Sequence, residues 1–145
     1  MIGNFIADFV KGKKMFDYPE GIQKGIALHR KIDYYTDHHE VTSRSKDPLR
    51  KKYRHYSGVI VDLYYDHFLA KNFRDYSTVD LGPYTENTYE ILSQNKDVLP
   101  AGVQQLLPYM IERNWLLNYA SLEGLSRTLS GLSKRVNFEN RMDEA

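Results

Sequence analysis

The sequence predicts an all-α protein that forms a single domain of about six or seven helices over residues 1–145. Apolar residues recur at three- and four-residue spacing in several segments, whereas no segment shows the sustained alternation typical of a strand. A chain of 145 residues has the usual size of one domain and can bury one substantial core. We find no internal repeat.

The first predicted helix opens the chain, in the segment IGNFIADFVKG. Gly12 follows it and provides a natural C-terminal stop. The second predicted helix runs from about Pro19 to His39, because proline fits the first turn of a helix and the segment GIQKGIALHRKIDYYTD continues at helical spacing. The apolar residues that share one face of the first helix are Ile2, Phe5, Ile6, Phe9 and Val10.

The middle of the chain predicts a polar connection followed by a central helix. Residues 40–57 are polar and contain Asp47-Pro48, which leaves room for a short helix. The next segment, GVIVDLYYDHFLAKNF, is apolar on almost every side, as in a helix at the centre of a domain. Its β-branched residues would suit a strand, but Asp62 and Asp66 at four-residue spacing favour a helix.

The last third predicts further helices and a frayed end. Thr85 or Asn87 is available as a cap for the segment PYTENTYEILSQNK. We expect Pro108 to kink or divide the long stretch that follows, because proline removes a helical hydrogen bond. The tail at 137–145 is polar, so we expect it to be frayed.

Composition excludes several classes of function. The chain has no cysteine, which excludes disulfides, thiolate catalysis and cysteine-based metal sites and suits a reducing compartment such as the cytoplasm. The formal net charge of +1 gives no case for nucleic-acid binding. No stretch approaches the roughly 20 apolar residues of a membrane span. Specific side chains must therefore indicate the function.

The stretch HRKID contains the first such side chains. His29 and Asp33 lie four residues apart, on the same predicted helix face as Ile22 and Ile26. If that face meets the core, Asp33 requires a cation, because an isolated buried carboxylate is very costly.

Aspartate and histidine recur on predicted helix faces at three separated places. A divalent metal would explain this recurrence, since carboxylates and imidazoles are its natural ligands and the set contains no sulfur, which favours Mn²⁺, Fe²⁺ or Mg²⁺, with Zn²⁺ also open through histidine. The alternative is that these residues only form core hydrogen bonds or pair with Arg30, Arg54 or Arg113. The residues concerned are Asp8, His29, Asp33, Asp37, Asp62, Asp66 and His67.

Three segments, GNFIADFVKG, GIALHRKIDYYTD and DLYYDHFLAKNF, together resemble the acyl carrier protein phosphodiesterase family in order and spacing. The later RNWLLNYASLEGLSRTLSGLSKR is also similar to that family's C-terminal half. The resemblance implies an all-helical fold distantly related to the HD-type phosphohydrolases. It also implies a divalent metal, typically Mn²⁺, and the release of 4′-phosphopantetheine from holo acyl carrier protein, within fatty acid biosynthesis.

The same resemblance implies roles for individual residues. Asp8 becomes the leading metal-site carboxylate. Apart from the resemblance, our mechanistic hypothesis is that Asp37 or Asp62 accepts a proton from water and that Arg30 or Lys31 holds the phosphate. Family members usually begin with an additional segment similar to NFLAHL and continue further at the C-terminus, so we expect this sequence to be a truncated or short form. The implied metal ligands are Asp8, His29, Asp33, Asp66 and His67, with Asp62 as a further member of the site.

Two other functions remain open at this point. Metal ligands do not encode the substrate, so a phosphohydrolase that acts on another phosphoester such as a nucleotide is one alternative. A non-catalytic helical binding module, in which the aspartates are only polar contacts between helices, is the other.

Overall fold

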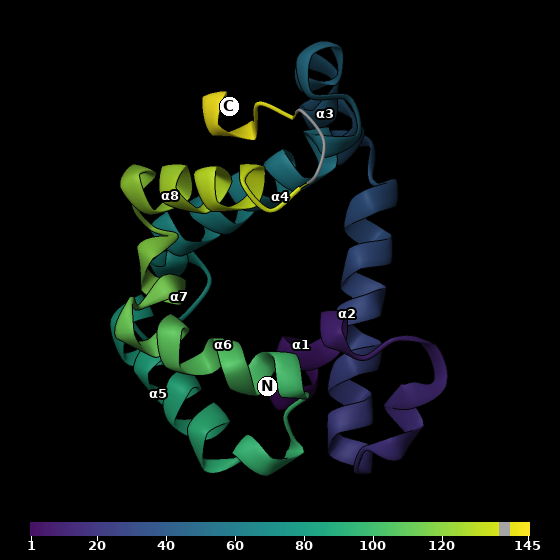
Figure 1. The fold of residues 1–145 in the computed structure, drawn as a ribbon, viewed down its shortest axis with the longest axis vertical. Coiled ribbons are helices and arrows are strands. Elements are labelled where there is room, and N and C mark those ends of the chain that lie inside the picture. Colours follow the sequence, from purple (N-terminus) through teal and green to yellow (C-terminus); the bar gives the residue numbers. More distant parts are fainter. Residues whose placement is uncertain (137–139) are drawn as a thin grey trace. The chain divides into compact units, whose positions relative to one another are not determined.

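The computed structural model describes residues 1–136 and 140–145, and every regular element in these ranges is helical (Figure 1). The all-α prediction is therefore confirmed. Eight α-helices are present in the described ranges, against the six or seven expected, because two of them have only five and four residues. The α-helices are α1 (Ile2–Ile6), α2 (Glu20–His38), α3 (Glu40–Tyr53), α4 (Ser57–Lys71), α5 (Leu81–Gln94), α6 (Ala101–Glu112), α7 (Trp115–Asn118) and α8 (Leu122–Ser133).

Short 3₁₀-helices follow several of these α-helices. They are η1 (Ala7–Phe9), η2 (Gly12–Asp17), η3 (Arg54–Tyr56), η4 (Phe73–Asp75), η5 (Lys96–Val98) and η6 (Met142–Glu144). No described helix has both the length and the apolar character needed to cross a bilayer.

The chain folds into two compact units, each built from two separate stretches of sequence. Unit 1 contains Met1–Asp37 and Gly82–Asn114, and unit 2 contains His38–Leu81 and Trp115–Ala145. Each unit is described by itself below. The expectation of one domain over the whole chain stays a prediction.

In unit 1, α1 crosses α2 at a pair of glycines. A Cβ atom on Gly3 would lie 2.0 Å from the carbonyl oxygen of Ile22, and one on Gly25 would lie 2.9 Å from the backbone nitrogen of Asn4. Both distances are far below van der Waals contact, so the two backbones approach this closely only because neither glycine has a side chain. This crossing fixes the N-terminal segment against α2 (Figure 1).

Apolar side chains from all four helices of unit 1 are buried around this crossing and elsewhere in the unit. Ile6 of α1, Ile26 of α2, Leu92 of α5 and Val103 of α6 are almost fully buried. The Phe9 ring of η1 faces Gly102 of α6, whose Cβ would lie 3.2 Å from it. Gly102 thus allows the Phe9 ring to lie against the backbone of α6.

Unit 2 has its own apolar cluster. It combines side chains of α3, α4, α8 and η6, and the most deeply buried members are Ile60, Leu125, Leu129 and Met142. The helix predicted around Asp62 and Asp66 is confirmed as α4, and its buried residues include Ile60, Leu63 and His67.

Residues 140–145 are not frayed as we expected. Met142 is only 1% exposed and joins the apolar cluster of unit 2, while Asp143 and Glu144 contact Ser133 and Lys52. Met142, with Ala145 packed beside it, therefore fixes the end of the chain in the apolar cluster that includes Leu125 and Leu129 of α8. Residues 137–139, the remainder of the predicted tail, lie outside the described residues.

Three local expectations differ from the structure, each for a physical reason, while a kink of α6 at Pro108 stays a prediction. The short helix expected in residues 40–57 is the 14-residue α3, which continues through Pro48. Thr85 does not cap α5, because the helix begins at Leu81 and the Thr85 hydroxyl instead donates to Gly82 O. Pro108 does not divide the following stretch, since α6 continues to Glu112 and ends where Asn114 adopts a positive φ.

Two substitutions at matched positions of α2 test the glycine crossing. Gly25→Ala places a Cβ against the α1 backbone and should destabilise the protein by about 1–3 kcal/mol, as overpacking does. Gly21→Ala, one turn earlier and with nothing within 4 Å of its Cβ, should stabilise it by about 0.5–1 kcal/mol through helix propensity. Urea unfolding measures both, and equal stabilisation by the two variants would contradict the close crossing.

Candidate functional site

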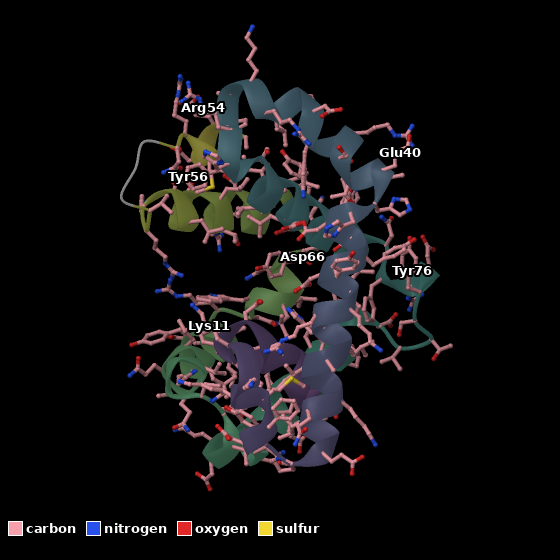
Figure 2. The ribbon with its side chains drawn as sticks, turned by 90° about the vertical axis from the view of Figure 1, so that its right-hand side faces the viewer. Lys11, Glu40, Arg54, Tyr56, Asp66 and Tyr76 are labelled. Atoms are coloured by element: carbon pink, nitrogen blue, oxygen red, sulfur yellow. The ribbon has the colours of Figure 1, made fainter. Side chains whose placement is uncertain are left out.

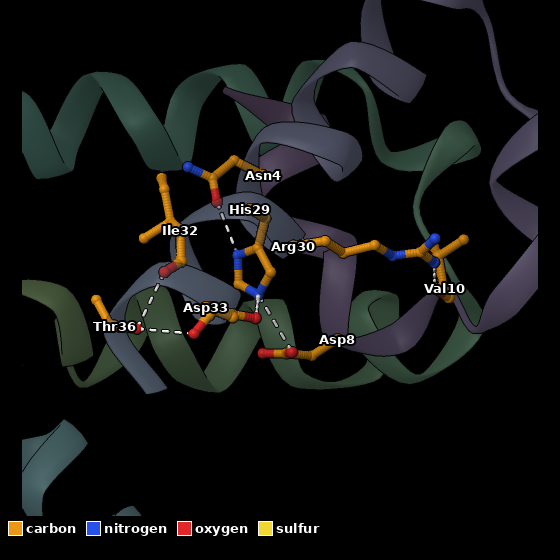
Figure 3. Close-up of polar contacts among 8 residues, drawn as sticks. All are labelled: Asn4, Asp8, Val10, His29, Arg30, Ile32, Asp33 and Thr36. Carbon is orange, nitrogen blue, oxygen red and sulfur yellow. Dashed lines mark hydrogen bonds and ion pairs between the residues drawn. The ribbon is translucent and has the colours of Figure 1, made fainter. Parts of the chain in front are cut away.

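Three side chains converge on one point in unit 1 (Figure 3). His29 Nε2 lies 3.1 Å from Asp33 Oδ2 and 3.3 Å from Asp8 Oδ1. His29 and Asp33 come from successive turns of α2, and Asp8 comes from η1, which follows the helix that crosses α2. One possible ligand atom from each of the three residues lies within 4.8 Å of the other two. Among the described residues, these three form a group of histidine and acidic side chains that could hold a metal ion.

The cluster is at the surface of unit 1, contrary to the buried helix face that we inferred from the sequence. The side chain of His29 is 23% exposed, whereas those of Asp33 and Asp8 are 52% and 78% exposed. The helix face that carries Ile26, His29 and Asp33 is buried at Ile26, partly exposed at His29 and open to water at Asp33. Burial therefore does not require a cation at Asp33. Only the positions of the possible ligand atoms can indicate an ion here.

Asn4 contacts the His29 ring on the side away from the two carboxylates. His29 Nδ1 lies 2.8 Å from Asn4 Oδ1 (Figure 3), so the ring donates its Nδ1 proton to the amide oxygen. A neutral ring then offers a lone pair at Nε2, toward the two carboxylates. In this tautomer the imidazole lone pair and the two carboxylates face the same point, an arrangement that would suit a cation.

The donor set fits a divalent metal. Ligand atoms bound about 2.1 Å from one ion and at right angles to one another lie about 3 Å apart, close to the 3.1 and 3.3 Å observed. One imidazole and two carboxylates suit Mn²⁺, Fe²⁺ or Mg²⁺, and Zn²⁺ through the imidazole. The exposed carboxylates leave room for water and substrate beside the three residues.

Arg30 contacts the N-terminal segment, and its expected role in phosphate binding stays a prediction. Its Nη2 donates to the carbonyl oxygens of Val10 at 2.7 Å and Gly12 at 3.2 Å, and its Nη1 lies 3.2 Å from Met15 Sδ. The guanidinium thus holds the segment between η1 and η2 against α2. Asp37, one turn beyond Asp33 on α2, is exposed and is not a member of the three-residue cluster among the described residues.

Asp62, Asp66 and His67 belong to α4 of unit 2. His67 is buried, and its Nδ1 donates a hydrogen bond to Tyr119 O at 2.7 Å. The ring nitrogen Nε2 takes no part in this hydrogen bond. Burial, together with the negative charge of Asp62, raises the pKa of Asp66 to about 6. Asp66, labelled in Figure 2, also retains exposure to solvent, so water screens part of this effect. The metal-ligand roles of Asp66 and His67 stay predictions.

Asn4 is a site residue that the sequence pattern does not indicate. The available signal was its position one helical turn before Asp8, which places the two side chains near each other. Its contact with His29, 25 residues further along the chain, depends on the crossing of α1 and α2, which no local pattern predicts.

The fold and the cluster define an all-helical protein with a candidate metal centre of one histidine and two aspartates. A match to the family described as acyl carrier protein phosphodiesterase covers residues 1–145. The chain belongs to this family.

Curated relatives with the name acyl carrier protein phosphodiesterase agree with that assignment. The protein of Photorhabdus laumondii is 28% identical over 93% of this chain and 69% of its own length. The one from Yersinia pestis is 29% identical over 93% of this chain and 70% of its own length, and the one from Klebsiella pneumoniae (strain 342) is 31% identical over 92% and 69%. No solved structure matches the chain.

The raised pKa of Asp66 predicts a pH dependence of stability in the ion-free protein. Between about pH 4 and pH 6 the folded state binds more protons than the unfolded chain, so Asp66 lowers the free energy of unfolding as the pH rises through this window. Asp66→Asn should therefore be more stable than the parent above pH 6 and equally stable below pH 4. Urea unfolding at a series of pH values measures the difference.

Asp62→Asn is the control for the cause of this shift. Removing the charge of Asp62 should lower the pKa of Asp66 toward its ordinary value, which carboxyl NMR titration measures. A parent and an Asp66→Asn variant whose stabilities differ by the same amount at every pH would contradict the raised pKa.

Proposed function

We propose that this chain is a metal-dependent phosphodiesterase that releases 4′-phosphopantetheine from holo acyl carrier protein. The observation that carries the metal part of this proposal is the convergence of Asp8, His29 and Asp33. The substrate part rests on membership of the acyl carrier protein phosphodiesterase family.

Asp8, His29 and Asp33 would hold the ion, for which Mn²⁺ is our first choice and Fe²⁺ or Mg²⁺ the alternatives. Such an ion supplies Lewis acidity toward a phosphodiester and makes a hydrolytic water available near neutral pH. Asp37 lies outside the cluster on the same helix, and we propose that its carboxylate accepts the proton of that water. Lys31 is exposed beside Arg30 and is a candidate to hold the phosphate, since Arg30 is engaged by the backbone.

Exposed basic residues next to the cluster support a protein substrate that is acidic. Lys11, Lys13 and Lys14 lie on or beside η2, three to six residues after Asp8, and all three are exposed. Arg30 holds this segment by its carbonyl groups, so the lysines project from a fixed backbone. An acyl carrier protein is strongly acidic and would be attracted to such a surface. We place the reaction in the cytoplasm, which the absence of cysteine suits.

Loss of a cluster carboxylate should abolish the reaction. With holo acyl carrier protein and Mn²⁺, Asp8→Asn and Asp33→Asn should each lower the rate of conversion to the apo form by more than about a hundredfold, as expected when a metal ligand is removed. Mass spectrometry measures apo protein and free 4′-phosphopantetheine. Asp17→Asn, an exposed carboxylate of the same unit, is the matched control and should keep the parent rate.

Two outcomes of this assay would change the proposal. Full turnover by both cluster variants would exclude the site. Release of phosphate from nucleotides by the parent, without any conversion of carrier protein, would favour a phosphohydrolase of another substrate.

Metal binding should also be visible without turnover. An ion that binds only the folded state at 100 times its dissociation constant stabilises that state by about 2.7 kcal/mol. Chelated parent protein should therefore gain about this much unfolding free energy on addition of Mn²⁺, whereas Asp33→Asn should gain much less. Calorimetric titration supplies the dissociation constant, and an unchanged unfolding midpoint in the parent at saturating Mn²⁺ would contradict the metal centre.

A further inference from the structure

We propose that Asn4 is a positioning residue that keeps the His29 proton on Nδ1 and thereby leaves Nε2 free to bind a divalent cation. This inference rests on the proposed metal centre and adds to it a residue outside the ligand set. Asn4 contacts His29 directly, through the 2.8 Å hydrogen bond between its amide oxygen and ring Nδ1.

The first step is a competition for one proton. A neutral imidazole has a single N–H, and the hydrogen bond that one nitrogen makes determines which of the two carries it. Asn4 Oδ1 can only accept, so it favours the proton on Nδ1. Asp33 and Asp8, at 3.1 and 3.3 Å from Nε2, are also acceptors and favour the proton on Nε2.

The outcome of this competition decides whether the site is open. With the proton on Nε2, the ring donates to the carboxylates, and the nitrogen that faces them has no lone pair for an ion. With the proton on Nδ1, the lone pair and both carboxylates face the same point. Asn4 thus opposes the Nε2-protonated tautomer, which Asp8 and Asp33 alone would favour.

The second step is the rigidity of Asn4. A Cβ atom on Gly25 would lie only 2.9 Å from the backbone nitrogen of Asn4. The main chain of Asn4 therefore packs directly against α2, one turn before His29. The close crossing therefore places an amide oxygen over the ring, although the Asn4 side chain is itself exposed. An exposed asparagine without such support would exchange this contact for water.

Two substitutions test whether Asn4 accepts a hydrogen bond from His29 Nδ1 or donates one to it. Asn4→Asp retains an acceptor and removes the amide donor, whereas Asn4→Leu has a similar size and no polar atom. Metal affinity is measured calorimetrically with Mn²⁺ alone. The position of the ring proton is measured by ¹⁵N NMR of the metal-free protein, in which no ion imposes a tautomer, and the spectrum is simple because the chain has five histidines.

In the metal-free protein, the parent and Asn4→Asp should both carry the ring proton of His29 on Nδ1, and Asn4→Leu should carry it on Nε2, toward the carboxylates. Asn4→Leu should bind Mn²⁺ about 10–100-fold more weakly than the parent, which is the usual effect of removing a partner that orients a metal-binding histidine. Because Asp also adds negative charge, the NMR signal, and not the affinity alone, decides whether Asn4→Asp restores the positioning role.

Asn87→Leu is the matched control. Asn87 is an exposed asparagine on α5 of the same unit, and its substitution should change neither the affinity nor the spectrum. Thermal unfolding without metal verifies that each variant is folded.

The outcomes distinguish this inference from the proposed function. Equal Mn²⁺ affinity and an unchanged Nδ1 proton in Asn4→Leu would overturn the role of Asn4 and leave the metal centre intact. A parent whose His29 ring carries its proton on Nε2 would show that Asn4 donates to Nδ1 and would also overturn it. No Mn²⁺ binding by the parent would overturn the metal centre and this inference together.

Discussion

The close approach of α1 to α2 is the constraint on which the candidate site depends. Gly3 and Gly25 let the two backbones meet at a distance that any side chain would prevent. Because the crossing occurs one turn before His29, the N-terminal segment delivers both Asn4 and Asp8 to the same imidazole. Two residues without side chains thus determine where three polar side chains meet.

His29 and Arg30 attach the N-terminal segment to α2 in two directions. His29 contacts Asn4 and Asp8, and the adjacent Arg30 contacts the carbonyl groups of Val10 and Gly12, about 100° further around the helix. Apolar side chains of the same segment are buried as well, since Ile6, Ala7 and Val10 are at most 5% exposed. The segment that bears Asp8 is therefore held both by apolar packing and by polar contacts to the helix that supplies the other two cluster residues.

The sequence predicted the local features of this arrangement and missed those that depend on a second element. Four-residue spacing brings His29 to Asp33 within one helix, and the all-helical pattern was correct. The exposure of Asp33, the contacts of Arg30 and the contact of Asn4 with His29 depend on what α1 and η1 do against α2, which helical periodicity does not encode. Likewise, Met142 looks like part of a polar tail until α8 provides the surface on which it packs.

The exposure of the cluster changes the reason for expecting an ion. Buried carboxylates would require a cation for folding, but Asp8 and Asp33 are open to water, where two unit charges 4 Å apart repel by only about 1 kcal/mol. The fold can tolerate that cost without an ion. In the metal centre that we propose, the same two negative charges would attract a divalent cation, and the half-open position would leave coordination positions accessible to a phosphodiester. An arrangement that is slightly unfavourable for the empty fold and favourable for a bound ion is what a catalytic metal site needs, whereas a structural site would be closed.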